Sequence, residues 1–235
     1  MTQSRPSPLE SADEPANTNG HRHTPFPDQP LEIIHHDERL VVLNKPSGLL
    51  SVPGIGPDKA DCLASRVAEA LPGARIVHRL DRDTSGVIVM ALDDQAHRDL
   101  SVQFQDRNVE KQYVAVVNGC VEDDEGEINE PMRKDLDDPP RQIIDHEQGR
   151  PAVTRWRVLK RHEDRTRLEL TPITGRSHQL RLHLKIMGHP ILGDDLYAPD
   201  DVLHMADRLL LHASRLTITH PGTGERMTHH VPAPF

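Results

Sequence analysis

Short runs of apolar residues, separated by polar turns rich in proline and glycine, recur from about residue 31 to the end of the chain. The runs at 31–36 and 40–45 predict two strands that are joined by a polar turn. The runs at 74–80 and 86–92 predict a second pair of strands around a polar turn at 81–85.

The second half of the chain continues mainly in strands. Residues 154–162 and 165–173 predict a hairpin, because a polar Glu163–Asp164 turn separates two strand-like runs. Further strands are predicted at 110–119, 209–220 and 225–231. Many strands and few helices indicate an α+β fold with a mixed, largely antiparallel sheet and flanking helices.

Three segments carry apolar residues at helical spacing. They are 61–73, with Leu63, Val67 and Leu71 on one face; 93–106, with Leu100 and Phe104; and 177–188, with Leu180, Leu184 and Met187. Ser177 can cap the last of these helices, and Gly188 can end it.

Two segments do not fit a packed core. Residues 1–30 are rich in proline and polar residues without apolar periodicity, so they predict a disordered leader before a single domain at 31–235. The stretch 121–148 contains many carboxylates together with Pro139–Pro140. It predicts a peripheral insertion that supplies no core element.

The formal net charge of −9 argues against nucleic-acid binding until its distribution is considered. Residues 119–149 hold three basic and eleven acidic side chains, whereas residues 150–185 hold ten basic and three acidic ones. The acidity is therefore segregated, and the basic segment can form either an ordinary solvated face or a surface for phosphates.

The two cysteines and the apolar runs bear on location. Cys62 and Cys120 lie far apart and fit neither a disulfide framework nor a paired zinc site. The chain shows no signal peptide and no run long enough to span a membrane. We therefore expect a soluble, cytoplasmic protein.

A first candidate site lies at 78–86, where apolar strands flank the sequence HRLDRDTSG. A turn uses Asp, Thr, Ser and Gly for structural reasons alone, so a purely structural turn is the simpler interpretation. The density of function-capable groups favours more than a turn, and an aspartate such as Asp81 beside arginines is held ionised.

A second candidate lies at 174–183, where Arg176 precedes a predicted helix that carries Arg181 and Lys185 one turn apart. A helix N-terminus beside an arginine is a natural phosphate site, although a basic outer face explains the same pattern. Tyr113, which follows Lys111 and Gln112 at the start of a strand, is by itself more typical of packing.

Five segments, in this order, carry a resemblance that covers nearly everything from residue 31 to the end. They are VVLNKPSGLLSVPG (41–54), HRLDRDTSGVIVMA (78–91), EKQYVAVVNG (110–119), PITGRSHQLRLHLKIMGHPILGDDLYA (172–198) and RLLLHASRLTITHP (208–221). Together they resemble the successive signature blocks of RluA-type pseudouridine synthases, and HRLDRDTSG is close to diagnostic. In the sequence of the fourth block, and in lacking an S4-like module, the chain most resembles the short RluA subgroup.

The resemblance implies a pseudouridine synthase fold with a central RNA-binding cleft, and a catalytic set of Asp81, Tyr113 and Arg181. Asp81 corresponds to the essential carboxylate. Tyr113 corresponds to the tyrosine that stacks on the target base and is available to assist proton removal. Arg181 corresponds to the basic residue that pairs with the aspartate, with Arg176 as a nearby competitor. Arg79 resembles the arginine that fills the space left by the flipped base.

The remaining implications concern substrate and partners. The further residues expected to bind substrate are His78, Arg79, Lys111, Arg176, His178 and Gln179. The expected substrate is a uridine in a tRNA anticodon stem-loop, a hairpin of 23S rRNA, or both. The reaction calls for no cofactor or metal, and we expect a monomer. The leader and the acidic 121–148 segment depart from the family pattern and leave the RNA footprint open.

The same sequence suggests other functions less well. A metal hydrolase is suggested by His178, His183, His189, Asp194 and Asp195, but their spacing matches no usual zinc site. A serine hydrolase would need Ser177 in a different motif, and a kinase would need a glycine-rich loop and more chain. A non-catalytic RNA-binding protein on the same scaffold is the main alternative.

Overall fold

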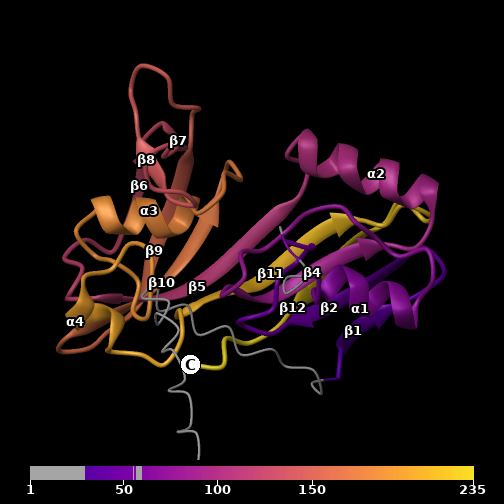
Figure 1. Cartoon of the computed structure of the whole chain (residues 1–235), viewed down its shortest axis with the longest axis horizontal. Coiled ribbons are helices and arrows are strands. Elements are labelled where there is room, and N and C mark those ends of the chain that lie inside the picture. The colour runs from indigo at the N-terminus through magenta and orange to yellow at the C-terminus, as the bar shows by residue number, and fades with distance from the viewer. Residues whose placement is uncertain (1–29, 55, 57–59) are drawn as a thin grey trace, which may run out of the picture.

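A computed structural model describes residues 30–54, 56 and 60–235 of the chain. Ten strands form one mixed sheet, with β1-β2-β4-β11-β5-β10-β9-β6 as its main order, β3 paired with β4, and β12 paired with β11 (Figure 1). Two further strands, β7 and β8, pair only with each other. Among the described strand pairs β4 and β11 run parallel and the others antiparallel, which confirms the predicted fold class.

The first half of the chain forms one end of this sheet and two helices. Its elements are β1 (Glu32–His36), β2 (Leu40–Lys45), α1 (Leu63–Ala70), β3 (Arg75–Ile76), β4 (Ser85–Ala91), α2 (Asp94–Gln105) and β5 (Glu110–Asn118). The second half supplies β6 (Glu125–Asn129), β7 (Met132–Lys134), β8 (Gln142–Ile144), β9 (Val153–Arg161), β10 (Arg165–Pro172), α3 (Gln179–Ile186), α4 (Asp200–Leu203), β11 (Leu211–Thr219) and β12 (Arg226–His230).

Strand β4 is buried along its whole length because helices cover both of its faces. Side chains alternate between the faces of a strand. Val87 and Val89 therefore pack with Leu100 of α2, while Ile88 and Met90 pack in a second core with helix α1. A third core forms where α3 contributes its predicted apolar face, Leu180, Leu184 and Met187, against residues of β9 and β10 such as Trp156 and Leu170.

Gly86 permits the parallel contact between β4 and β11. Its backbone has φ 114°, and a Cβ at this position would lie 2.2 Å from the carbonyl oxygen of Ala213. Only glycine accepts both the left-handed backbone and this close approach. The residue therefore fixes the place where the polar loop at 81–84 leaves the sheet.

Two element boundaries differ from the prediction. The strand predicted at 74–80 is confined to Arg75–Ile76, because the next residues turn away from the sheet. The helix predicted from Ser177 begins at Gln179, and Ser177 does not cap it. His178 occupies the cap position with φ 55° and makes no capping hydrogen bond, while the Ser177 hydroxyl accepts a hydrogen bond from Arg79 instead.

The acidic segment 121–148, predicted as a peripheral insertion, contains three strands. It supplies β6 at the edge of the large sheet and the β7–β8 hairpin, which project together at one end of the molecule (Figure 1). The prediction that this segment provides no core element is wrong, because Met132 is buried in a cluster with Leu182 and Tyr197. No helix of the described residues is long and apolar enough to cross a membrane. The predicted leader lies outside the described residues except for Pro30.

Candidate active site

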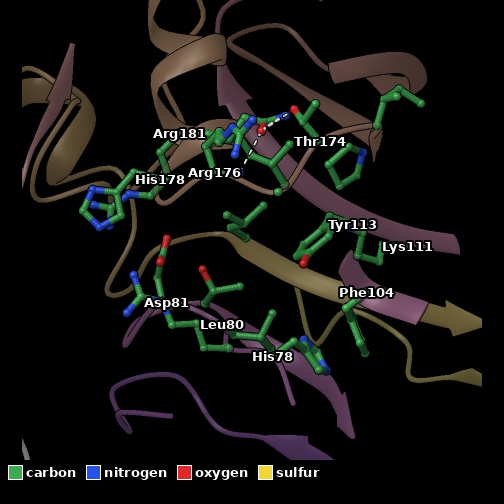
Figure 2. Close-up of a pocket in the computed structure, with 18 of the residues that line it drawn as sticks. His78, Leu80, Asp81, Phe104, Lys111, Tyr113, Thr174, Arg176, His178 and Arg181 are labelled. Carbon is green, nitrogen blue, oxygen red and sulfur yellow. Dashed lines mark hydrogen bonds between the residues drawn. The ribbon is translucent and has the colours of Figure 1, made fainter. Parts of the chain in front are cut away.

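A cavity of about 440 Å³ brings together the residues that the sequence motifs singled out. The loop before β4, the start of β5 and the loop that leads into α3 line it. In Figure 2 the Asp81 carboxylate and the Tyr113 hydroxyl both point into the space between these segments. All the site residues predicted from the sequence line this cavity, namely His78, Arg79, Asp81, Lys111, Tyr113, Arg176, His178, Gln179 and Arg181.

The backbone on both sides of Asp81 is held by the end of β2 and by the segment that follows it. The Ser51 hydroxyl donates to the carbonyl oxygen of Leu80 at 2.7 Å and accepts from the Leu80 amide at 3.1 Å. On the other side, the Lys45 ammonium donates to the carbonyl oxygen of Arg82 at 2.8 Å. Because its neighbours are anchored in this way, the Asp81 side chain has a fixed origin at the cavity wall.

The Asp81 carboxylate itself makes no hydrogen bond or ion pair within the part of the chain that the structure describes. Its negative charge acts through space on Arg181, His178 and Tyr113. Both carboxylate oxygens are therefore available to a molecule that enters the cavity.

Arg181 is buried and belongs to a different ion pair from the one expected. Its Nε donates to Asp194 at 2.8 Å, and its Nη2 donates to both Asp194 and Asp195. The expected direct pairing with Asp81 is wrong, and Arg176, the predicted competitor, donates from Nε to the Pro151 carbonyl. Burial lowers the pKa of Arg181, but the hydrogen bond and charge of Asp194, followed by the charge of Asp81, raise it well above its usual value. Arg181 is therefore a fixed cation that acts on Asp81 at longer range.

Tyr113 forms the wall opposite Asp81. Burial raises the pKa of its phenol well above the usual value, and the Asp81 charge raises it further. The side chain is therefore a neutral phenol at physiological pH. A neutral phenol suits stacking and hydrogen bonding better than proton removal.

His78 and Phe104 form an aromatic floor. Their rings stack with centroids 4.3 Å apart at an interplanar angle of 17°. The Nε2 of His78 accepts a hydrogen bond from the Val89 amide at 3.2 Å, so the ring is held in one orientation. Burial, and then the nearby Lys111 charge, lower the pKa of His78 to about 3, so this ring is neutral.

Gln179 serves the protein scaffold rather than a substrate. Its amide oxygen accepts from the Thr174 hydroxyl and the Arg176 amide, and its amide nitrogen donates to Val153 and Thr154. A primary amide has two donor hydrogens and two acceptor lone pairs, so its capacity is exhausted. The prediction that Gln179 binds substrate directly is therefore corrected: it shapes the loop at 174–176.

Positive charge dominates the cavity. Among its described lining residues one carboxylate, Asp81, faces five cationic side chains: Arg79, Arg107, Lys111, Arg176 and Arg181. Such a ring of cations around a hollow attracts a polyanion and orients its phosphates.

Comparisons with known proteins agree with this geometry. The family described as "RNA pseudouridylate synthase" matches residues 39–185. The chain belongs to this family. It is 49% identical over 214 residues to the "Dual-specificity RNA pseudouridine synthase RluA" of Pasteurella multocida, covering 91% of this chain and 98% of that protein. The protein of the same name from Haemophilus influenzae is 51% identical over 206 residues, 87% of this chain and 94% of that one.

A solved structure supports the same fold for this pseudouridine synthase. "Human RNA Pseudouridylate Synthase Domain Containing 1" superimposes with a TM-score of 0.74 at 28% identity, over 88% of this chain and 84% of that chain. The chain is thus an RNA pseudouridine synthase with RNA as its substrate, as the motif blocks predicted.

Several residues of this pseudouridine synthase site were not assigned from the sequence. Lys45 and Ser51 lie in the first motif block, but nothing in the pattern showed that they hold the backbone beside Asp81. Asp194 and Asp195 were considered only as metal ligands, whereas both contact Arg181. The sequence did not identify Tyr197 as a residue of the site, although its ring centroid lies 5.4 Å from the Arg181 guanidinium. The two adjacent aspartates, Asp194 and Asp195, two residues before Tyr197 were the one available signal.

The residues that suggested a metal or serine hydrolase make other contacts in the pseudouridine synthase. His183 contacts Thr154, and His189 contacts the Asn118 carbonyl, so these rings face different parts of the protein from His178. Among the described residues no group of three or more His, Cys, Asp or Glu is placed to hold a metal ion. Ser177 has the guanidinium of Arg79 as its hydrogen-bond partner, which is not a general base.

Proposed function

We propose that this enzyme isomerises a uridine in a tRNA anticodon stem-loop, a hairpin of 23S rRNA, or both, and that Asp81 is its essential carboxylate. The observation that carries the proposal is the unpartnered Asp81 carboxylate, which opens into a cationic cavity opposite Tyr113. The name of the similar proteins, "dual-specificity", supports more than one RNA substrate.

The reaction breaks the bond from uracil N1 to C1′ of the ribose, turns the base, and joins C5 to C1′. The proton displaced from C5 is lost and N1 gains one, so no electrons are transferred and no group leaves. A glycosidase normally uses two carboxylates, one to protonate the leaving group and one to attack the sugar or to activate water. Here the base stays in the cavity, so one carboxylate suffices. Asp81 has three routes: attack on C1′, attack on the base, or removal of the C2′ proton.

A uridine stacked in RNA cannot bring its C1′ to a carboxylate inside a cavity, so it must be flipped out of its stack. The neutral phenol of Tyr113 offers a surface for the flipped base. Arg79 lies at the cavity wall, where it donates to Ser177 at 2.9 Å, and it is placed to occupy the gap in the RNA. Arg107, Lys111 and Arg176 would contact the flanking phosphates, which makes binding sensitive to salt.

The first test is direct. The purified protein, with chelator and no added cofactor, is incubated with tRNA anticodon stem-loop and rRNA hairpin transcripts. Pseudouridine is then mapped by carbodiimide treatment and primer extension. We expect a stop on at least one transcript, and we expect Asp81→Asn to lower the rate by about 1000-fold or more.

The matched control is Asp207→Asn, which makes the same change at an exposed aspartate outside the cavity. It should leave the rate unchanged. Activity of Asp81→Asn within tenfold of the wild type would refute the assignment of Asp81. Retained RNA binding without modification by the wild type on either transcript would favour a different RNA substrate or a non-catalytic role.

The proposal includes a monomeric enzyme in the cytoplasm. Both cysteines are free, as in a reducing compartment. Light scattering of the purified protein with and without RNA would test the monomer, and fractionation of cells would test the location.

A further inference from the structure

Tyr197 lies behind the cavity, and its hydroxyl joins two parts of the protein. The oxygen accepts a hydrogen bond from the backbone amide of Gln142, in β8, at 2.8 Å. It also lies 3.0 Å from Nδ1 of His178, which lines the cavity. The Tyr197 ring is buried, meets the His178 ring edge-on, and lies under the guanidinium of Arg181.

Counting protons fixes the direction of the bond to His178. A backbone amide can only donate, so one lone pair of the Tyr197 oxygen is occupied by Gln142. The phenol has a single proton, and burial raises its pKa to about 12, so the proton is present at neutral pH. Among the described residues Nδ1 of His178 is its available acceptor. If Nδ1 of His178 donated instead, the buried Tyr197 proton would have no acceptor among the described residues, which costs free energy. The favoured arrangement is therefore Nδ1 of His178 as acceptor, with the proton of the neutral ring on Nε2.

Nε2 of His178 is free to meet a ligand. It makes no hydrogen bond to a described residue, and it is not among the buried polar atoms without a partner, which are Arg39 Nε, Asp93 Oδ2 and His229 Nε2. Solvent therefore reaches it. Burial lowers the pKa of His178, and the charges that face it are Asp81, Arg181, Asp194 and Asp195.

The backbone conformation of His178 supports a fixed orientation of its ring. Its φ of 55° is uncommon for a residue other than glycine, although histidine, like asparagine and aspartate, adopts it more readily than most residues do. The residue gives no capping hydrogen bond to α3 in return. The strained backbone instead sets the ring between the Tyr197 hydroxyl and the cavity. Strain of this kind is often found where a side chain must be aimed.

We infer that Tyr197 is a positioning residue that fixes His178 in its Nε2–H form, and that His178 donates a hydrogen bond from Nε2 to an oxygen of the flipped uridine. The inference rests on the proposed function in that it takes this cavity as the uridine site. Uracil carbonyls and ribose hydroxyls all present such oxygens. His178 lies on the same side of the cavity as Arg181, above Asp81 in Figure 2, so a donor on its ring can orient the nucleotide near the carboxylate.

The tautomer can be measured without RNA. Long-range ¹H–¹⁵N correlation spectra of the ¹⁵N-histidine-labelled protein distinguish protonated from unprotonated ring nitrogens, and the His178→Gln spectrum identifies the signals of His178. We expect an unprotonated Nδ1 and a protonated Nε2 in the wild type. In Tyr197→Phe we expect both tautomers to be populated. A protonated Nδ1 in the wild type would overturn the inference.

Two substitutions of His178 separate donation from backbone strain. The amide nitrogen of glutamine falls near the position of Nε2, whereas that of asparagine falls near Nδ1. Asparagine, however, tolerates a left-handed backbone better than glutamine does. We expect the kcat/KM of His178→Gln to exceed that of His178→Asn by about tenfold, even if the asparagine variant is the more stable. Equal or higher activity of His178→Asn would contradict donation from Nε2.

Tyr197→Phe should lower kcat/KM by about 5- to 30-fold, the equivalent of losing one or two hydrogen bonds. Its control is Thr228→Val, which removes a hydroxyl bond of 2.9 Å between β12 and β11, away from the cavity. A Tyr197→Phe variant that is less stable but keeps its kcat/KM and its His178 tautomer would show a purely structural role. Absence of pseudouridine formation by the wild type on either transcript would refute the proposed function and leave the tautomer result standing, so the two failures are distinguishable.

Discussion

Lys45 shows how one residue links the fold to the active site. It is fully buried, and its ammonium donates to three backbone carbonyls, those of Pro46, Leu49 and Arg82, at 2.6 to 2.8 Å. An ammonium has three hydrogens to donate, so each of them has a partner. The side chain thereby joins the end of β2 to the residue that follows Asp81. Burial lowers the pKa of Lys45 to about 7, while the charges of Asp83 and Asp81 oppose the shift. The side chain is therefore a buried group that stabilises a loop rather than a cation that binds RNA.

At the residue scale we therefore predict that Lys45→Met destabilises the protein by about 3 kcal/mol, because buried carbonyls lose their donor. The rate of pseudouridine formation should fall as well, since the loop with Asp81 loosens. Urea denaturation and the primer-extension assay measure the two effects. Lys160→Met, at an exposed position on β9, should change stability by less than about 0.5 kcal/mol. Equal urea midpoints for the two variants would show that the bonds of Lys45 contribute little.

At the element scale, periodicity predicted the elements whose side chains meet a core. Buried and exposed positions alternate along much of β9 and β10, and Leu180 and Leu184 lie one helical turn apart. Burial requires apolar residues at these positions, so the pattern is visible in the sequence. The strand predicted at 74–80 is longer than the one observed because Val77 and Leu80 are apolar, yet both lie outside the strand pairing and pack into the cores on the two sides of β4. Polar contacts between distant residues leave no periodic signal.

The same limit applies to the site. Asp81, Tyr113 and Arg181 could be placed together from motif blocks, but the partners of Arg181 could not, since Asp194 and Asp195 meet it only in the folded chain. The Gln142 amide, which meets the Tyr197 hydroxyl, lies 55 residues before it. A backbone amide has no sequence signature, so no reading of the motifs could have found this contact.

At the element scale we predict how a substitution at the junction of β4 and β11 changes stability. Gly86→Ala places a methyl group against the Ala213 carbonyl and keeps a left-handed backbone, so we expect a loss of about 3 kcal/mol or more. Gly188→Ala is the control, because Gly188 also has positive φ but has open space around it. It should lose only about 1 kcal/mol. Thermal or urea denaturation of both variants measures the difference, and equal losses would mean that the close approach to β11 carries no energetic weight.

At the scale of the whole molecule, buried neutral histidines connect the elements around the sheet. His212 on β11 lies 2.8 Å from the Ser85 hydroxyl of β4 and 3.1 Å from the Val231 carbonyl. A carbonyl only accepts, so Nε2 carries the proton and Nδ1 accepts from Ser85. Burial lowers the pKa of His212 to about 4, as it lowers that of His78 to about 3. Both rings keep the neutral form in the folded protein well below the pH at which they charge in the unfolded chain.

This difference predicts how stability depends on pH. An unfolded histidine binds its proton near pH 6.5, whereas these two bind theirs only near pH 4 and pH 3 when folded. Between pH 6.5 and 4 the unfolded chain therefore holds more protons, and the free energy of unfolding falls as pH falls. The slope is at most about 1.4 kcal/mol per pH unit for each histidine. Urea denaturation at pH 6.5, 5.5 and 4.5 measures it. His212→Gln lowers stability at every pH, but it should also remove one histidine's share of the slope. An unchanged slope in His212→Gln would show that His212 is not a source of the acid sensitivity.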